Sequence, residues 1–234
     1  MPTPRVPEAQ PLRLAVPDTG DVSAALLLPQ DPTACFVFAH GAGAGMDHAL
    51  MRALATALCQ RGVATLRFQF PAMERGSKRP DSPAVAHAAV RAAVALARSR
   101  LPGLPLLAGG KSFGGRMTSQ AQAAAPLEGV RGLVFVGFPL HPAGKPGRER
   151  AEHLSQVACP MLFLQGTRDA LADVALLHRA LAPLADRAHL VLVDDADHAF
   201  HVRASSGRND AQVMEMLGDE VAGWTARLLA APPW

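Results

Sequence analysis

Short apolar segments alternate with longer segments of helical periodicity along most of the chain. The run at 34–39 (ACFVFA) is typical of a strand covered on both faces, and Leu50, Leu54 and Leu58 recur along one helix face. This alternation predicts an α/β protein. The predicted strands cover residues 12–16, 22–28, 34–39, 63–70, 104–108, 130–136, 161–164 and 189–193. The predicted helices cover residues 47–61, 81–100, 113–125, 148–157, 174–184 and 210–229.

The order of these elements indicates how the sheet is built. Turn residues at 18–21 (DTGD) predict an antiparallel hairpin from the first two strands. The later strands alternate with helices, which favours a mostly parallel sheet with helices on both faces. The sequence shows no internal repeat and no linker, so residues 1–234 are predicted to form one domain. Residues 71–83 and 138–147 follow strands and are expected at the carboxyl edge, where open α/β sheets bind ligands.

Composition narrows the class of protein. With 49% hydrophobic and 18% charged residues, the 234-residue chain can bury a substantial core, which excludes a disordered protein. A net charge of +3 without a basic stripe predicts no nucleic-acid partner. No apolar run approaches the ~18 residues of a membrane span, and residues 1–7 lack a leader's apolar region, so a cytoplasmic protein is expected. The odd set of Cys35, Cys59 and Cys159 favours buried structural thiols in a reducing compartment.

The clearest chemical motif is Gly110-Lys111-Ser112-Phe113-Gly114, a G-x-S-x-G pattern between a predicted strand and a predicted helix. Small residues around the serine allow a sharp turn that lifts its hydroxyl above the sheet, at a helix N-terminus. Ser112 is therefore the candidate nucleophile; the plain alternative is a glycine-rich turn with an incidental serine. A phosphate-binding loop is disfavoured because Pro105 stands where its first glycine is needed.

A nucleophilic serine needs a base and an acid that orients the base, expected here in the chain order Ser, Asp or Glu, His. Asp169 and His198 each follow a predicted strand, so both are expected on the same rim as Ser112. Asp173 and His201 are rivals, but Asp173 is better placed to cap the next helix, and His201 lies further from its strand. The nearby carboxylates favour solvated loop charge over a metal site, and no metal or other cofactor is expected. They are Asp194, Asp195 and Asp197.

The oxyanion of a tetrahedral intermediate needs preorganised N–H donors. The backbone N–H of Phe113, directly after the serine, is predicted as one donor, and the glycine-rich loop after the strand at 34–39 should supply the other. Because the chain contains no tyrosine, both donors are expected from the backbone. The same loop does not match a dinucleotide-binding G-x-G-x-x-G pattern, because Met46 occupies its last position.

These motifs together resemble the α/β-hydrolase superfamily from about Leu12 to Leu229, and more narrowly a small lidless branch of predicted hydrolases loosely related to dienelactone hydrolases. The resemblance implies Ser112 as nucleophile, His198 as base and Asp169 as the orienting acid. It also implies that Ala42 and Phe113 donate to the oxyanion. Dienelactone hydrolases have a cysteine where this chain has its serine, so their substrate is not implied. The residues that carry the resemblance are 38–48 (FAHGAGAGMDH), 67–74 (RFQFPAME), 110–115 (GKSFGG), 165–169 (QGTRD) and 197–200 (DHAF).

The predicted function is hydrolysis of a small, soluble carboxylic ester or thioester through an acyl-enzyme. Two alternatives stay open. One is a non-catalytic binding or scaffold module, since the branch also resembles a eukaryotic chromatin-complex subunit with a hydrolase-like domain. The other is a serine peptidase for small peptides. The sequence does not indicate an oligomeric state.

The surroundings of the site are predicted less sharply. Residues 137–160, where many related proteins insert a lid, suffice for one short helix and no cap domain, which predicts an open site. Lys111 is expected either to contact substrate or to point to solvent. A group of charged residues after the strand at 63–70 is a candidate contact for an anionic substrate, although a solvated loop is favoured. The group comprises Arg67, Glu74, Arg75, Lys78 and Arg79.

Overall fold

The computed structural model describes residues 6–231. Residues 1–5, which contribute to the prediction that a leader is missing, and residues 232–234 lie outside the described part. The strands are β1 (Gln10–Val16), β2 (Gly20–Leu27), β3 (Ala34–Ala39), β4 (Val63–Phe68), β5 (Leu106–Lys111), β6 (Val130–Val136), β7 (Met161–Gly166) and β8 (Ala188–Val193). The α-helices are α1 (Ala49–Cys59), α2 (Pro71–Glu74), α3 (Pro83–Arg100), α4 (Phe113–Ala124), α5 (Val174–Leu181) and α6 (Asp210–Ala230). Shorter 3-10 segments are η1 (Glu149–Gln156), η2 (Ala182–Arg187) and η3 (Ala204–Ser206).

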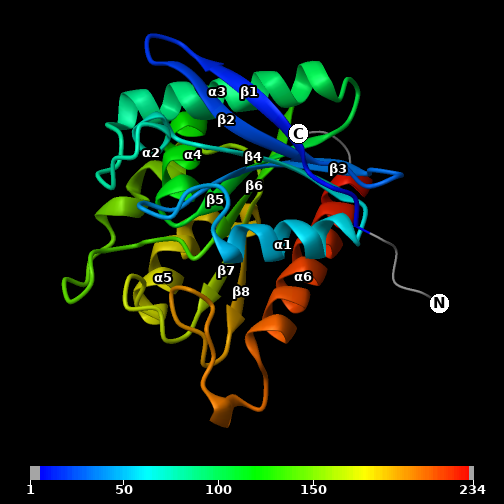
Figure 1. The fold of residues 1–234 in the computed structure, drawn as a ribbon. Coiled ribbons are helices and arrows are strands. Elements are labelled where there is room, and N and C mark those ends of the chain that lie inside the picture. The colour runs from blue at the N-terminus through cyan, green and yellow to red at the C-terminus, as the bar shows by residue number, and fades with distance from the viewer. Residues whose placement is uncertain (1–5, 232–234) are drawn as a thin grey trace.

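The strands form one sheet in the order β1-β2-β4-β3-β5-β6-β7-β8 (Figure 1). β1 pairs antiparallel with β2, and β2 with β4, whereas every pairing from β4–β3 to β7–β8 is parallel. The predicted hairpin and mostly parallel sheet are therefore confirmed. Because the parallel strands share one direction, the loops after β3, β5, β7 and β8 meet at one edge of the sheet.

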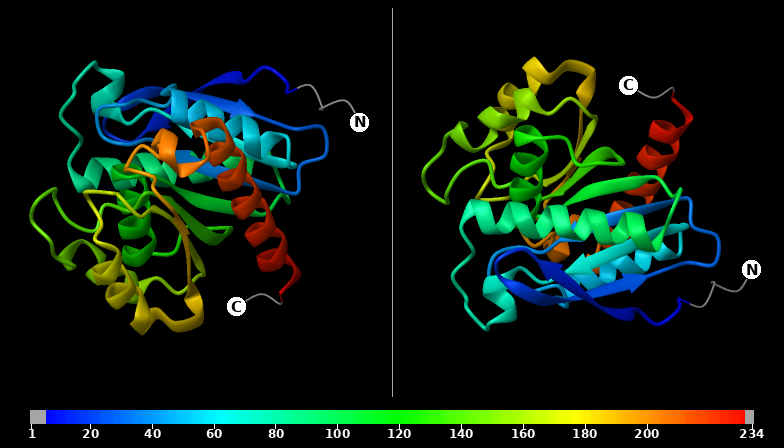
Figure 2. Two further views of the ribbon diagram at one scale, coloured as in Figure 1. Left: turned by 90° about the horizontal axis from the view of Figure 1, so that it is seen from below. Right: turned by 90° about the horizontal axis from the view of Figure 1, so that it is seen from above.

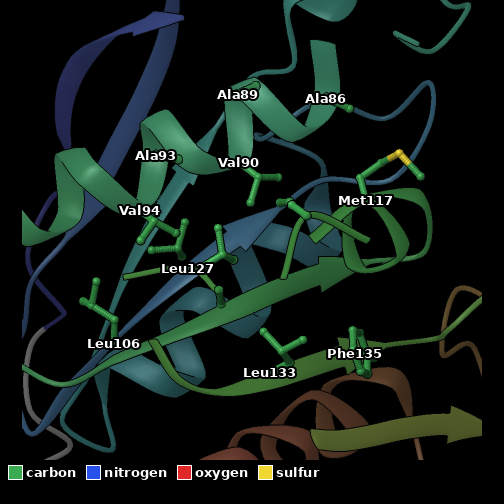
Figure 3. Packing of buried hydrophobic residues seen from close by; sticks show 14 of the residues in the cluster. Ala86, Ala89, Val90, Ala93, Val94, Leu106, Met117, Leu127, Leu133 and Phe135 are labelled. Atoms are coloured by element: carbon green, nitrogen blue, oxygen red, sulfur yellow. The ribbon is translucent and has the colours of Figure 1, made fainter. Parts of the chain in front are cut away.

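Helices cover both faces of the sheet (Figure 2). One apolar cluster joins α1 and α6 to one face, and a second joins α3 and α4 to the other. In the second cluster, Val90 of α3 and Met117 of α4 lie over Leu106, Leu133 and Phe135 of the central strands (Figure 3). Every residue of β3 is buried, as expected for a strand covered on both faces. The three cysteines are free and buried, as predicted.

The observed elements differ from the predicted ones mainly at their ends. β5 continues to Lys111, so the strand leads directly into Ser112. The stretch that follows β4 begins with the short helix α2, which Pro71 starts at a position where its missing N–H costs nothing. Within the described part, η1 is the one helical segment between β6 and β7, and no cap domain covers the edge. No helix of residues 6–231 has the length and apolarity required to cross a bilayer.

Candidate active site

Ser112 lies at the sharp turn between β5 and α4. Its φ of 49° and ψ of −115° are rarely adopted by a residue with a side chain. On both sides of the serine, other backbone segments approach this turn so closely that a side chain would not fit. A Cβ at Gly110 would lie 2.3 Å from the Ala39 carbonyl oxygen, and one at Gly114 would lie 2.5 Å from the His40 carbonyl oxygen. The two glycines of the motif therefore make this turn possible.

The structure brings Ser112, His198 and Asp169 together. Ser112 Oγ is 2.9 Å from His198 Nε2, and His198 Nδ1 is 2.7 Å from Asp169 Oδ2. The carboxylate of Asp169 is buried and also accepts hydrogen bonds from the Leu171 N–H (2.8 Å) and from Gln165 Nε2 (2.5 Å). An ionised carboxylate only accepts hydrogen bonds, so Nδ1 of His198 carries the proton and the lone pair on Nε2 lies on the side of the serine.

Contacts between the loops after β7 and β8 set the distance between acid and histidine. A Cβ at Gly166 would lie 2.3 Å from the Ala196 carbonyl oxygen, so the loops touch backbone to backbone. The Arg168 N–H donates to the same carbonyl at 2.9 Å. The Asp195 N–H donates to Thr167 Oγ1 at 2.9 Å. The two loops are therefore held as one unit.

The rival residues lie elsewhere. Asp173 caps α5 by accepting a hydrogen bond from the Leu176 N–H at 2.8 Å, as predicted. His201 is exposed and pairs with Asp210 at 2.9 Å, near the start of α6. Asp195 is not simply solvated, because it pairs with Arg203. Among the described residues, no group of three or more His, Cys, Asp or Glu side chains is arranged to hold a metal ion.

The loop after β3 depends on His40, which the sequence analysis did not single out. His40 Nε2 accepts a hydrogen bond from the Phe70 N–H at 3.0 Å, so Nδ1 carries the proton and donates to the Gly41 carbonyl at 2.7 Å. Fixing this carbonyl fixes the peptide plane, and in a trans peptide the N–H of Ala42 points the opposite way. Burial lowers the pKa of His40, which keeps the ring neutral. A histidine directly before a glycine-rich loop is the only sequence signal of this role.

Arg67 of β4 holds the same loop from the other side. Its Nη1 donates to the Met46 carbonyl at 2.8 Å and lies 3.1 Å from Asp47 Oδ1. Gln69 Oε1 accepts a hydrogen bond from the Met46 N–H at 2.8 Å. Because Arg67 is only 4% exposed, the expectation that it belongs to a solvated loop is wrong. Its charge supports the backbone and does not face the Ser112 pocket.

The other charged residues after β4 are also partly used for structure. Glu74 pairs with Arg13, and Arg75 lies 3.6 Å from Asp81. Lys78 and Arg79 are exposed and border a hollow of only about 10 Å³ beside Ala42 and Phe113. This hollow is large enough for about one water molecule.

A larger pocket opens directly at the serine. It has a volume of about 360 Å³, and its walls are mostly small or apolar. The backbone N–H groups of Ala42 and Phe113 have no hydrogen-bond partner in the described part of the chain, so both are free to donate. The pocket is lined by Gly41, Ala42, Ala44, His48, Leu50, Met51, Lys111, Ser112, Leu171, His198 and Ala199.

Lys111 lies beside the histidine, an arrangement that neither sequence alternative describes. Its Nζ is 3.1 Å from His198 Nε2 and 5.9 Å from the centre of the Phe200 ring. Burial lowers the pKa of Lys111 to about 8, and the negative charges of Asp169 and Asp197 offset only part of this decrease. Lys111 is therefore a cation with a weakened hold on its proton, next to the candidate base.

Known proteins resemble this chain in sequence and in fold. Residues 32–226 match the family model described as alpha/beta hydrolase domain. A lidless α/β serine hydrolase from Xanthomonas campestris is 25% identical, with a TM-score of 0.74 over 98% of this chain and 100% of that one. A dienelactone hydrolase from Anabaena variabilis is 22% identical, with a TM-score of 0.74 over 92% and 97% of the chains. The latter likeness concerns the fold.

Proposed function

The chain belongs to the alpha/beta hydrolase domain family, and from that premise we propose that it is a serine hydrolase for small carboxylic esters or thioesters. The observation that carries the proposal is the hydrogen-bonded series from Ser112 through His198 to Asp169, at the mouth of an open pocket. The family and the lidless serine hydrolase support hydrolysis in general. The pocket supports the narrower substrate class.

In the proposed acylation step, Ser112 Oγ attacks the carbonyl carbon while its proton moves to His198 Nε2. Asp169 keeps the imidazole in the required tautomer and stabilises the imidazolium that forms. The developing oxyanion lies between the N–H groups of Ala42 and Phe113. His198 then gives its proton to the leaving alcohol or thiol, which departs and leaves an acyl-serine.

Deacylation uses the same groups in the reverse sense. Water enters from the open edge, and His198 removes its proton as the oxygen attacks the acyl carbon. The second tetrahedral intermediate collapses when His198 returns the proton to Ser112 Oγ, which releases the carboxylic acid. No step requires a cofactor.

The dimensions and lining of the pocket support a small, largely apolar acyl group. A volume of about 360 Å³ is at the lower end of small-molecule sites. Leu50, Met51 and Leu171 supply apolar walls. Arg67 is one of the charged residues that are candidate contacts for an anionic substrate. Its guanidinium is buried and already binds the Met46 carbonyl, so it is not available to such a substrate.

The backbone at Ser112 favours an enzyme over a scaffold module. Holding a residue other than glycine in such a strained conformation lowers the stability of the fold by about 1–3 kcal/mol. A binding surface does not require this strain. In an enzyme the same conformation presents the hydroxyl to His198 and to substrate.

The test is a panel of p-nitrophenyl esters of graded acyl length, with labelling by a fluorophosphonate probe. We expect turnover and labelling of the wild type, and loss of both in Ser112→Ala. The matched control is Ser99→Ala, an exposed serine on α3, which should behave as the wild type. Absence of labelling in the wild type, or equal labelling of Ser112→Ala, would overturn the proposal. A fluorogenic dipeptide in the same assay separates an esterase from a peptidase.

A further inference from the structure

The lone pair on Nε2 of His198 faces two hydrogen-bond donors. Ser112 Oγ lies 2.9 Å from this nitrogen, and Lys111 Nζ lies 3.1 Å from it. Because Nδ1 holds the ring proton for Asp169, a neutral imidazole has a single acceptor site left. The serine hydroxyl and the lysine ammonium therefore compete for one lone pair.

The fold makes room for the ammonium at this position. Gly137, directly after β6, has a φ of 70°, and a Cβ there would lie 2.9 Å from Lys111 Nζ. Phe200 holds a φ of 62°, unusual for a bulky residue, and its ring lies 5.9 Å from the same nitrogen. Lys111 Nζ therefore occupies space that a side chain at position 137 would reduce, and it lies over the ring of Phe200.

The charges around Lys111 come from the loops after β7 and β8. Asp169 follows β7, whereas Asp197 and His198 follow β8. The two carboxylates favour the ammonium through space without contacting it, and the histidine contacts it directly. In the loop after β3 and directly after β6, the Lys111 side chain lies against Gly41 and Gly137, which carry no charge. A further titratable residue, His48 at the start of α1, lines the same pocket as Lys111.

We propose that Lys111 is a positioning residue that acts through His198: its ammonium occupies the Nε2 lone pair, and loss of one proton to the solvent in the pocket releases that lone pair to Ser112. A charged donor outcompetes a neutral hydroxyl for the same acceptor. The ammonium also disfavours the imidazolium that must form when His198 takes the serine proton. The neutral amine is a weaker hydrogen-bond donor than the ammonium, and it carries no charge that disfavours the imidazolium.

This inference rests on the proposed hydrolase function and predicts an alkaline rise in activity. Burial lowers the pKa of Lys111 to about 8, so about one molecule in ten carries the neutral amine at pH 7. On a neutral ester, kcat/KM of the wild type should rise about tenfold between pH 7 and pH 9.5. Lys111→Met, of similar length and without charge, should be about tenfold more active than the wild type at pH 7 and equal to it at pH 9.5.

Two further variants complete the experiment. Lys111→Arg keeps its charge throughout this range and should stay poorly active without an alkaline rise. The matched control is Lys145→Met, an exposed lysine between β6 and η1, which should keep the wild-type profile. A Lys111→Met profile identical to that of the wild type, or activity below the wild type at every pH, would overturn the inference.

NMR of the imidazole resonances of His198 gives a readout that needs neither activity nor a variant. In the wild type, these resonances should shift with a midpoint near pH 8, as the ammonium donor to Nε2 is lost. An unchanged spectrum across this range would overturn the inference.

The failure of this inference can be distinguished from the failure of the hydrolase proposal. If the protein reacts with the probe and turns over esters but fails these tests, only the role of Lys111 falls. If no ester is turned over at any pH, the hydrolase proposal falls and the positioning role of Lys111 falls with it, while the NMR titration still shows whether the ammonium binds Nε2 of His198.

Discussion

The two sides of Ser112 are held in place by different means. On the acid–base side, formed by the loops after β7 and β8, backbone contacts join the two loops directly, together with the hydroxyl of Thr167 and the exposed guanidinium of Arg168. On the oxyanion side, formed by the loop after β3 and the start of the segment after β4, three side chains supply the partners of the backbone. These are His40, Arg67 and Gln69. The acid–base side therefore depends mainly on the order of the strands and on the backbone contact at Gly166, whereas the oxyanion side depends mainly on individual polar side chains that are partly or fully buried.

Among the residues that support Ser112 and His198, the largest expected effect lies on the acid–base side, at Asp169. In Asp169→Asn the side chain has nearly the same shape, but its amide offers a donor or a weaker acceptor to His198 Nδ1, so the required tautomer is no longer enforced. We expect kcat to fall by about 10⁴. Ester hydrolysis under saturating substrate measures this loss, and circular dichroism should show an unchanged fold. A fall of less than about tenfold would mean that Asp169 does not orient the base.

A smaller effect is expected on the oxyanion side, at His40. His40→Phe keeps a ring against Phe70 but removes the donor to the Gly41 carbonyl, so the peptide plane before Ala42 is no longer fixed. We expect kcat/KM to fall by about 10², near the value for losing one oxyanion donor. The buried Phe70 N–H also loses its acceptor, which should lower the free energy of unfolding by about 1–3 kcal/mol.

His40→Asn is the matched variant for this prediction. An asparagine amide can place its nitrogen near the position of Nδ1, so it can retain the bond to Gly41 while still losing the bond from Phe70. We expect it to recover most of the activity but little of the stability. Equal activity of both variants would show that the Gly41 carbonyl does not need His40.

The same contrast explains what sequence reasoning predicts and what it misses. Ser112, Asp169 and His198 each follow a parallel strand, so strand order alone brings them to one edge. No comparable rule predicts which side chains support the loop on the oxyanion side. Arg67 has the appearance of a loop-end charge until the pairing of β4 with β3 buries it. The contact between Lys111 and His198 joins residues 87 positions apart, and no periodicity reports such a contact.

The pH dependence of stability offers a weaker test of the oxyanion side. Burial lowers the pKa of His40, so on acidification the unfolded chain takes up a proton that the folded chain does not. The stability is fully present well above the ordinary histidine pKa and is lost as the pH falls below about 6.5. His153, whose pKa burial and nearby cations lower to about 4, adds a slope of the same sign between these two values.

His40→Asn isolates the contribution of His40, because His153 is present in both proteins. Below pH 6.5, the free energy of unfolding of the wild type should fall more steeply than that of the variant, by at most about 1.4 kcal/mol per pH unit for one proton. Urea unfolding at pH 7.5, 6.0 and 5.0 measures the two slopes. Parallel slopes would show that His40 is protonated in the folded protein, which is incompatible with its bond from the Phe70 N–H.

The smallest expected effect is at His201, which follows the same strand as His198 but lies outside the acid–base side. His201 lies only three residues after His198, and both follow β8, so sequence position hardly separates them. In the structure His201 is exposed and faces Asp210 rather than Ser112. His201→Ala should therefore change kcat/KM by less than about twofold and leave the melting temperature unchanged, as for most exposed positions. His198→Ala, measured beside it, should reduce activity to the level of Ser112→Ala, because these residues act as one unit. A loss in His201→Ala as large as that in Asp169→Asn would identify His201 as the base. The contacts between the loops after β7 and β8 would then not serve to position the catalytic histidine.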